Sequence, residues 1–227
     1  MRRLRRPIFN PRVSTGISLR AAAIVALVTI AASSANAFEY AIDDGSGNYT
    51  IGPSQFDAQM LWGNYFDAVP DQETITSISV SFAGSVPLDR QVSVLLFEDP
   101  TDDLDPTDAS LVAQGSGLTA AAPVNSFLEF DIPDTQVDGG FFVGVLMDLA
   151  QHETPARMDP QNPQGRSWLF FDGEIDLGDL SSAPIIYNMA NTPFNGNWMV
   201  RATGVPEPNS LFYVVTLGVI ALLRRLN

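Results

Sequence analysis

The sequence predicts an all-β protein, an antiparallel β-sandwich most consistent with a jelly roll, flanked by an N-terminal signal peptide and a C-terminal hydrophobic helix. Three observations predict this class. Between the two ends, apolar and polar residues alternate in short runs, as in half-buried strands. Clusters of Gly, Pro, Asp and Asn separate these runs. No segment between the ends has a helical period, and no repeat of fixed length indicates a propeller or a solenoid. A closed barrel is the alternative.

The first 37 residues have the three parts of a secretory signal peptide. Six arginines lie among residues 2–20, an apolar run of 12 residues follows at 21–32, and Ala35 and Ala37 form an A-x-A site. Cleavage is predicted between Ala37 and Phe38, which implies passage through the Sec export machinery. The alternative is a membrane span, but such a helix needs roughly 20 apolar residues.

Residues 38–203 are predicted to form one β-sandwich ectodomain, because a segment of this length can bury one sizeable core. Nine or ten short strands are expected in all. The strongest alternating patterns lie at 73–82, 90–99, 125–132, 140–149, 166–173 and 197–203.

The segment between the two ends is strongly acidic. All 26 carboxylates of the chain lie between residues 38 and 207, against four arginines and no lysine there, so the net charge of this segment is −22. Such a surface repels nucleic-acid backbones and anionic lipid, which argues against both as partners. The chain has no cysteine, so it has no disulfide, thiol nucleophile or thiolate metal site.

The last segment, 204–227, contains an apolar run at 211–223 that is predicted to form a short transmembrane helix. Arg224 and Arg225 follow it, and positive charge beside such a run favours the cytoplasmic side. This orientation agrees with export of the domain. At 1.5 Å per residue the run spans only about 20 Å of a hydrocarbon core of about 30 Å thickness, which suits a segment that is recognised and then removed.

The motif Val205-Pro206-Glu207-Pro208, the apolar run and the terminal arginine pair together resemble the PEP-CTERM sorting signal, over the last 23 residues. The resemblance implies processing by an exosortase-type peptidase of a Gram-negative bacterium after a transient stay in the inner membrane. It also implies delivery to the cell surface or to an exopolysaccharide matrix. A permanent weak anchor and a buried core helix are the alternatives for these residues.

Residues 43–203 also resemble jelly-roll ectodomains that occur ahead of this sorting tail, through the segments DDG, WGNYF, EDPTDDLDPTD, FFVGV and WMVRAT in that order. Those ectodomains are largely uncharacterised. The resemblance therefore implies a fold rather than an activity.

The segment 98–108, EDPTDDLDPTD, is a dense cluster of carboxylates. Ca²⁺ binds about six to eight oxygen ligands, so the aspartates of this segment are candidate calcium ligands. They are Asp99, Asp102, Asp103, Asp105 and Asp108. Their spacing does not fit an EF-hand, and a solvated loop turned by two prolines is the alternative. The turn at 42–48 is a second candidate, with Asp43, Asp44 and Asn48.

Two weaker patterns point to carbohydrate. The segment 173–179 resembles the signature of laminarinase-type glycosidases through Glu174 and Asp176, but Asp179 stands where a glutamate is needed, and a loop explains the same residues. Several aromatic residues could stack on sugars, but most are expected in the core, since such residues commonly fill sandwiches. They are Trp62, Tyr65, Phe66, Trp168 and Trp198. The single histidine, His152, is expected to have no role.

Together these patterns predict an exported, non-enzymatic protein of the cell surface or extracellular matrix, with a structural or adhesive role. The alternatives are a carbohydrate-binding module of the exopolysaccharide matrix and a laminarinase-like glycoside hydrolase. The expected partners are the processing peptidase, the export machinery and matrix polysaccharide. Ca²⁺ is the candidate cofactor.

Overall fold

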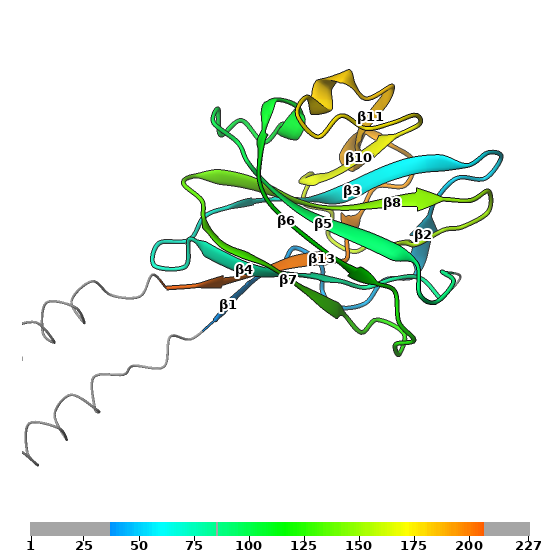
Figure 1. The fold of residues 1–227 in the computed structure, drawn as a ribbon, viewed down its shortest axis with the longest axis horizontal. Coiled ribbons are helices and arrows are strands. Elements are labelled where there is room, and N and C mark those ends of the chain that lie inside the picture. Colours follow the sequence, from blue (N-terminus) through cyan, green and yellow to red (C-terminus); the bar gives the residue numbers. More distant parts are fainter. Residues whose placement is uncertain (1–36, 85, 207–227) are drawn as a thin grey trace, which may run out of the picture. The chain divides into compact units, whose positions relative to one another are not determined.

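A computed structural model describes residues 37–84 and 86–206 (Figure 1). These residues form 13 strands and three short 3-10 helices. The strands are β1 (Phe38–Tyr40), β2 (Tyr49–Ile51), β3 (Ala58–Asp67), β4 (Thr74–Val80), β5 (Gln91–Glu98), β6 (Ser110–Leu118), β7 (Leu128–Gln136), β8 (Gly140–Leu149), β9 (Ala156–Asp159), β10 (Ser167–Phe171), β11 (Ile185–Asn188), β12 (Asn197–Trp198) and β13 (Val200–Val205). The helices are η1 (Pro106–Asp108), η2 (Leu180–Ser182) and η3 (Met189–Asn191).

The prediction of an all-β, antiparallel sandwich is confirmed. A six-stranded sheet has the order β11-β10-β3-β8-β5-β6, and a four-stranded sheet has the order β1-β13-β4-β7. A small third sheet, β12-β9-β2, lies beside them. The two large sheets keep open edges, at β11 and β6 in one and at β1 and β7 in the other, so the alternative of a closed barrel is wrong.

The six predicted runs are all strands, with small differences at their ends. The run at 125–132 begins later, at Leu128, and continues to Gln136 through Pro133. Proline is tolerated there because β7 is an edge strand, whose outward N–H groups need no partner in the sheet. The run at 197–203 divides into β12 and β13. The count of 13 exceeds the expected nine or ten because several strands are only two to four residues long.

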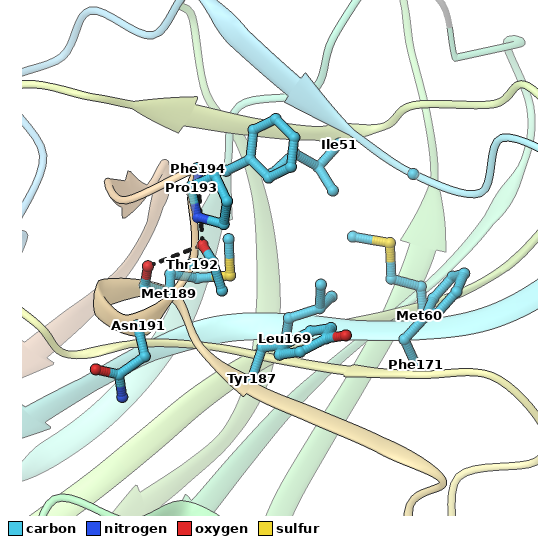
Figure 2. A pocket seen from close by; sticks show the side chains of 11 residues that line it. Ile51, Met60, Leu169, Phe171, Tyr187, Met189, Asn191, Thr192, Pro193 and Phe194 are labelled. Atoms are coloured by element: carbon cyan, nitrogen blue, oxygen red, sulfur yellow. Dashed lines mark hydrogen bonds between the residues drawn. The ribbon is translucent and has the colours of Figure 1, made fainter.

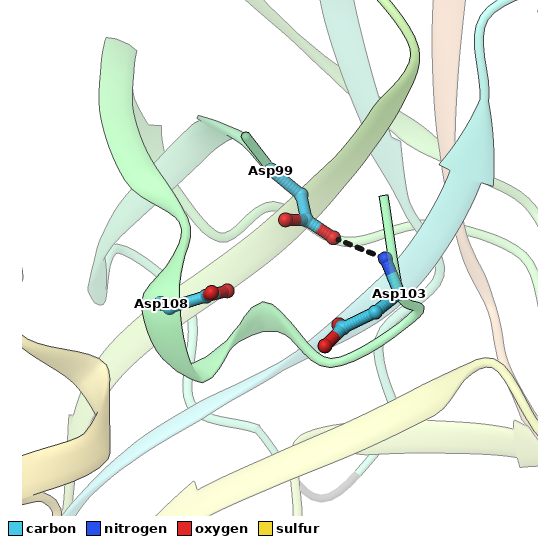
Figure 3. A group of neighbouring side chains, drawn as sticks. All are labelled: Asp99, Asp103 and Asp108. Atoms are coloured by element: carbon cyan, nitrogen blue, oxygen red, sulfur yellow. Dashed lines mark hydrogen bonds between the residues drawn. The ribbon is translucent and has the colours of Figure 1, made fainter. Parts of the chain in front are cut away.

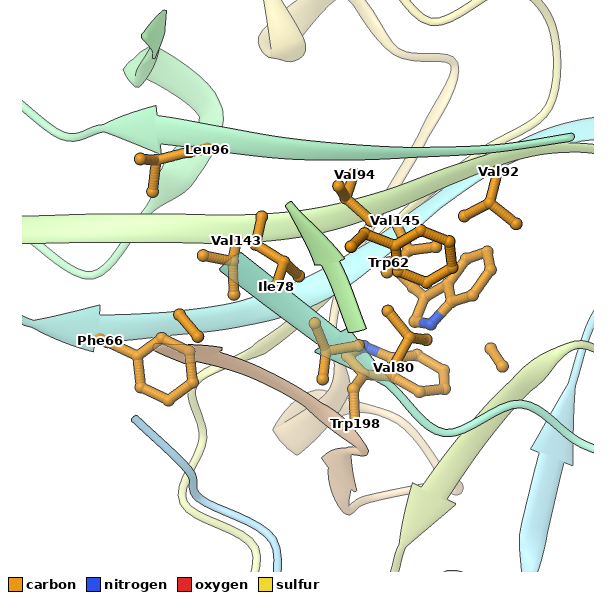
Figure 4. Close-up of a cluster of buried hydrophobic side chains, with 14 of the residues drawn as sticks. Trp62, Phe66, Ile78, Val80, Val92, Val94, Leu96, Val143, Val145 and Trp198 are labelled. Atoms are coloured by element: carbon orange, nitrogen blue, oxygen red, sulfur yellow. The ribbon is translucent and has the colours of Figure 1, made fainter. Parts of the chain in front are cut away.

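The main hydrophobic core lies between the four-stranded and the six-stranded sheet (Figure 4). Along β5, alternate residues Val92, Val94 and Leu96 face this core, as the two-residue period of a strand requires. Leu95 and Phe97 face the opposite side of the same sheet, where a second cluster forms. The six-stranded sheet is therefore buried on both faces at its centre.

The loop and helix segment between β10 and β11 covers the second cluster. Ile175 and Leu180 from this segment are buried against Leu61 of β3 and Phe142 of β8. Central strands covered on both sides read as nearly continuous apolar runs, and β8 (GFFVGVLMDL) has that character.

Residues 1–36 of the predicted signal peptide, among them Ala35, lie outside the described residues, as do Glu207, Pro208, the apolar run at 211–223 and the arginine pair. Within 37–84 and 86–206, no helix has the length and apolar character to cross a membrane. Ala37 directly precedes β1, and Pro206 directly follows β13.

Candidate functional site

The acidic loop between β5 and β6 gathers three of its five predicted ligands. Asp99, Asp103 and Asp108 each place one carboxylate oxygen within 4.8 Å of the others (Figure 3). Asp99 is 2% exposed, whereas Asp103 and Asp108 are exposed. This is the pattern that the carboxylate density of the sequence predicted, although Asp102 and Asp105 do not join the group.

Hydrogen bonds already occupy the carboxylate of Asp99. One oxygen accepts from the backbone N–H and the hydroxyl of Thr101, at 2.8 and 2.9 Å. The other accepts from the hydroxyl of Tyr65 at 2.6 Å and from the backbone N–H of Asp103 at 3.2 Å. Because a carboxylate has about four acceptor positions, this set leaves Asp99 little capacity to bind a metal ion as well.

The same contacts shift two pKa values in opposite directions. Burial by itself raises the pKa of Asp99, but the hydrogen bonds from Tyr65, Thr101 and the backbone stabilise the charged form more strongly, so that the pKa is lowered. The pKa of Tyr65 is raised, first by burial and then by the carboxylates of Asp99 and Asp102. Both shifts keep Asp99 ionised and Tyr65 protonated, which maintains the bond between them.

Two further aspartates of the loop stabilise its turns. Asp105 accepts from the backbone N–H of Thr107 at 3.0 Å and caps η1. Asp103 accepts from the backbone N–H of Asp105 at 2.9 Å. Asp102 has a φ of 55°, a left-handed conformation that aspartate tolerates better than most residues. Much of the carboxylate density therefore serves the conformation of the loop.

The second candidate turn is held by an arginine. The guanidinium of Arg201 donates to both carboxylate oxygens of Asp43, at 2.5 and 3.0 Å, and also to Glu39 at 2.8 Å. Asp44 accepts from the backbone N–H and the hydroxyl of Ser46. The positive charge that Asp43 contacts is thus supplied by the chain itself.

The segment that resembles a glycosidase motif is a loop. Residues 173–179 contain no strand, whereas the motif requires one. Glu174 lines a surface hollow together with Asp57 and Asp148, and Asp179 does not line that hollow. Instead, Asp179 accepts from the hydroxyl of Ser181 at 2.5 Å. The loop that the sequence offered for this segment is confirmed, and the strand that the motif needs is not formed there.

Four of the five aromatic residues proposed from the sequence are core residues, as expected. Trp62, Tyr65, Phe66 and Trp198 are 0–4% exposed. Trp168 is half-buried, and its backbone carbonyl accepts from the indole N–H of Trp198 at 2.8 Å. A sugar-stacking platform made of these residues is therefore wrong.

A different set of aromatic residues lines a groove that the sequence did not indicate (Figure 2). Its volume is about 340 Å³. Leu169 and Phe171 of β10 and Tyr187 of β11 form one wall, and Phe194 of the loop after η3 lies across from Tyr187. Met60, Met189 and Ile51 complete the apolar lining. Tyr187 and Phe194 are 48% and 57% exposed, high values for large apolar side chains.

The groove offers few free polar groups. Thr192 lines it, but its hydroxyl donates to the carbonyl of Met189 at 3.0 Å and accepts from the backbone N–H of Phe194 at 3.2 Å. The hydroxyl of Tyr187 and the amide of Asn191 remain as polar groups of the lining. The groove therefore suits a ligand group that is apolar, or one that binds to aromatic rings, better than a group with many hydroxyls.

Comparison of the sequence with protein-family models and with curated proteins finds no match.

Proposed function

We propose that this protein is an exported, non-enzymatic component of the cell surface or of an exopolysaccharide matrix, with a structural or adhesive role. In this proposal the chain leaves the cytoplasm through the Sec machinery, and an exosortase-type peptidase of a Gram-negative bacterium processes its PEP-CTERM tail. The observation that carries the proposal is the agreement between the boundaries of the fold and the two processing sites.

The first strand begins where the predicted signal peptide ends. Phe38, the first residue after the predicted cleavage site, opens β1 and pairs with Gly204 of β13. The last strand, β13, ends at Val205, where the Pro-Glu-Pro motif follows. Cleavage at both places would leave every strand intact. This agreement supports a design in which the ends are processing signals and the sandwich is the mature product.

The strand order supports a jelly-roll assignment. Eight strands form the frame, in chain order β1, β3, β4, β5, β6, β7, β8 and β13. One sheet contains the first, eighth, third and sixth of them side by side, and the other contains the second, seventh, fourth and fifth. This alternation between two sheets is the order expected of two interlocked Greek keys. The strands β10 and β11 extend the second sheet beyond this frame.

We also propose that Ca²⁺ binds weakly at the acidic loop. Asp103 and Asp108 are exposed and lie close together, while Asp99 is occupied by its own hydrogen bonds. A site with so few free ligands is expected to bind with a dissociation constant at the weak end for extracellular modules, about 1 mM. At such affinity Ca²⁺ would be a counter-ion of the loop rather than a condition for folding.

The decisive experiment is the intact mass of the protein recovered from the native host, in membrane and supernatant fractions. We expect a supernatant species that lacks the first 37 residues and the tail after the Pro-Glu-Pro motif. The variant Glu207→Ala should retain its tail and accumulate in the membrane, while the control Glu174→Ala, at an exposed glutamate, should be processed normally. A full-length C-terminus found only in the membrane would instead support the permanent anchor.

A further inference from the structure

We propose that the groove beside β11 is a binding site for a small organic ammonium ion, whose quaternary or alkyl end lies between the rings of Tyr187 and Phe194. This inference concerns the sandwich alone and is independent of the proposed export route. It rests on the aromatic walls of the groove, on the charge of the domain and on the scarcity of free polar groups in the lining.

The walls present aromatic and polarisable surfaces to a ligand. Tyr187 and Phe194 lie on opposite sides of the groove and are about half exposed (Figure 2). The half-buried ring of Phe171 closes one end, and the exposed ring of Phe56 lies 5.8 Å from it. Aromatic faces carry partial negative charge and attract cations, most strongly where water is displaced. A volume of about 340 Å³ falls within the range of small-molecule sites.

The charge of the domain favours a cation. Residues 37–206 contain 25 carboxylates and four arginines, so their net charge is −21. No arginine lines the groove. No carboxylate lines it either, so the charge acts through the potential of the whole domain. The negative potential of such a surface raises the local concentration of cations and lowers that of anions.

The lining disfavours the other ligand classes. A sugar ring carries several hydroxyls, but the side chains of the lining offer it the hydroxyl of Tyr187 and the amide of Asn191, because the hydroxyl of Thr192 is already bonded. Most sugar hydroxyls would face apolar walls, and burying them unpaired is unfavourable. A neutral apolar molecule fits the walls but gains nothing from the charge. An ammonium ion with an apolar substituent gains from the apolar walls and from the negative charge of the domain.

The test compares choline with 3,3-dimethyl-1-butanol, which has the same shape and no charge, by calorimetric titration of the full-length chain. We expect choline to bind at least about fivefold more tightly, as one cation–aromatic contact provides. Raising the ionic strength should weaken choline binding and leave the neutral analogue unchanged. Tyr187→Leu and Phe194→Leu should each lower the affinity for choline about fivefold and leave that for the alcohol similar.

Phe38→Leu is the matched control, because Phe38 is an exposed aromatic residue of the other large sheet. It should bind both probes as the unmodified chain does. Phe194 lies in a loop, so Phe194→Leu carries the test even if a change at Tyr187 in β11 prevents folding. Equal affinities for the two probes would overturn the proposal in favour of a purely apolar site. Absence of choline binding, or tighter binding of cellobiose, would overturn it as well.

Discussion

The buried side chain of Asn64 connects the two large sheets, and its replacement by aspartate tests how the sandwich is held together. The carboxamide N–H groups of Asn64, on β3, donate to the backbone carbonyls of Trp198 and Val200, at 2.7 and 2.8 Å. Its carbonyl accepts from the hydroxyl of Ser167 at 2.7 Å, and that hydroxyl accepts from the backbone N–H of Trp198 at 3.1 Å. Asn64 is 0% exposed.

Asn64→Asp keeps the shape of the side chain and removes both donors. Two buried carbonyls then lose their partners and face a carboxyl group, and each buried group left without a partner costs about 1–3 kcal/mol. We therefore expect a loss of about 3–5 kcal/mol in the free energy of unfolding at pH 7. For a domain of this size that lowers Tm by roughly 10 °C.

The assay is urea denaturation followed by tryptophan fluorescence, since Trp62 and Trp198 are buried in the same core. Burial raises the pKa of the introduced carboxyl above its unfolded value near about 4, so the deficit should shrink as the pH falls from neutrality towards 4. Asn195→Asp, at an exposed asparagine, should change stability by less than about 0.5 kcal/mol. If Asn64→Asp were as stable as this control at pH 7, the network would not stabilise the contact between the sheets.

Three further outcomes are expected. The pKa of Asp99 is lowered in the folded protein, so the ionised carboxylate stabilises the fold at pH values above its unfolded pKa of about 4. This contribution is lost as the pH falls through the pKa of Asp99 in the folded state. Asp99→Asn should therefore make Tm depend less on pH on the acid side. A Cβ on Gly63 would lie 1.9 Å from the carbonyl oxygen of Val143, whereas one on Gly84 meets nothing within 4 Å, so thermal melts should show Gly63→Ala strongly destabilised and Gly84→Ala unchanged. If the loop binds Ca²⁺ at about 1 mM, 10 mM Ca²⁺ should stabilise the protein by about 1.4 kcal/mol and raise Tm by about 3–6 °C, an increase that Asp108→Asn reduces and a chelator abolishes.

The sequence predicted the long strands well because their burial follows the two-residue period. In β5, Val92, Val94 and Leu96 alternate with residues of the opposite face, and this local pattern needs no knowledge of the neighbours. The short strands lack such a pattern. β11 is a four-residue edge strand, and its partner β10 precedes it by a loop of 13 residues, from Asp172 to Pro184. Its pairing depends on where that loop returns the chain, which no local periodicity encodes.

At the two candidate sites, too, local sequence patterns predicted some features, whereas contacts between distant segments could not be predicted. Carboxylate density placed Asp99, Asp103 and Asp108 together, but it could not show that Tyr65, 34 residues before Asp99, donates to that carboxylate. The groove was missed because Leu169 and Phe171 follow the same alternation as core residues. β10 and β11 extend the six-stranded sheet beyond the edge of the four-stranded sheet. Leu169 and Phe171 therefore face the loop that carries Phe194 rather than a facing sheet, and they line a groove.

The four arginines of a domain with a net charge of −21 all contact acceptors far from them in the chain. Each of them joins segments that are distant in the chain. Arg201 on β13 binds Glu39 and Asp43 near the start of the domain and lies 4.1 Å from the ring centre of Phe127. Arg90 pairs with Glu153, and Arg166 pairs with Asp67.

Arg157 is the most buried of the four, at 7% exposure, and it bonds to neutral acceptors. Its guanidinium donates to the carbonyls of Gly47 and Phe82 and to the side-chain carbonyl of Asn125. Three loops are thereby attached to β9. Because each arginine is committed to such a contact, the remaining carboxylates gain little neutralisation from the chain. The anionic surface is thus left without counter-charge from the chain, a condition that favours the cations proposed for the acidic loop and for the aromatic groove.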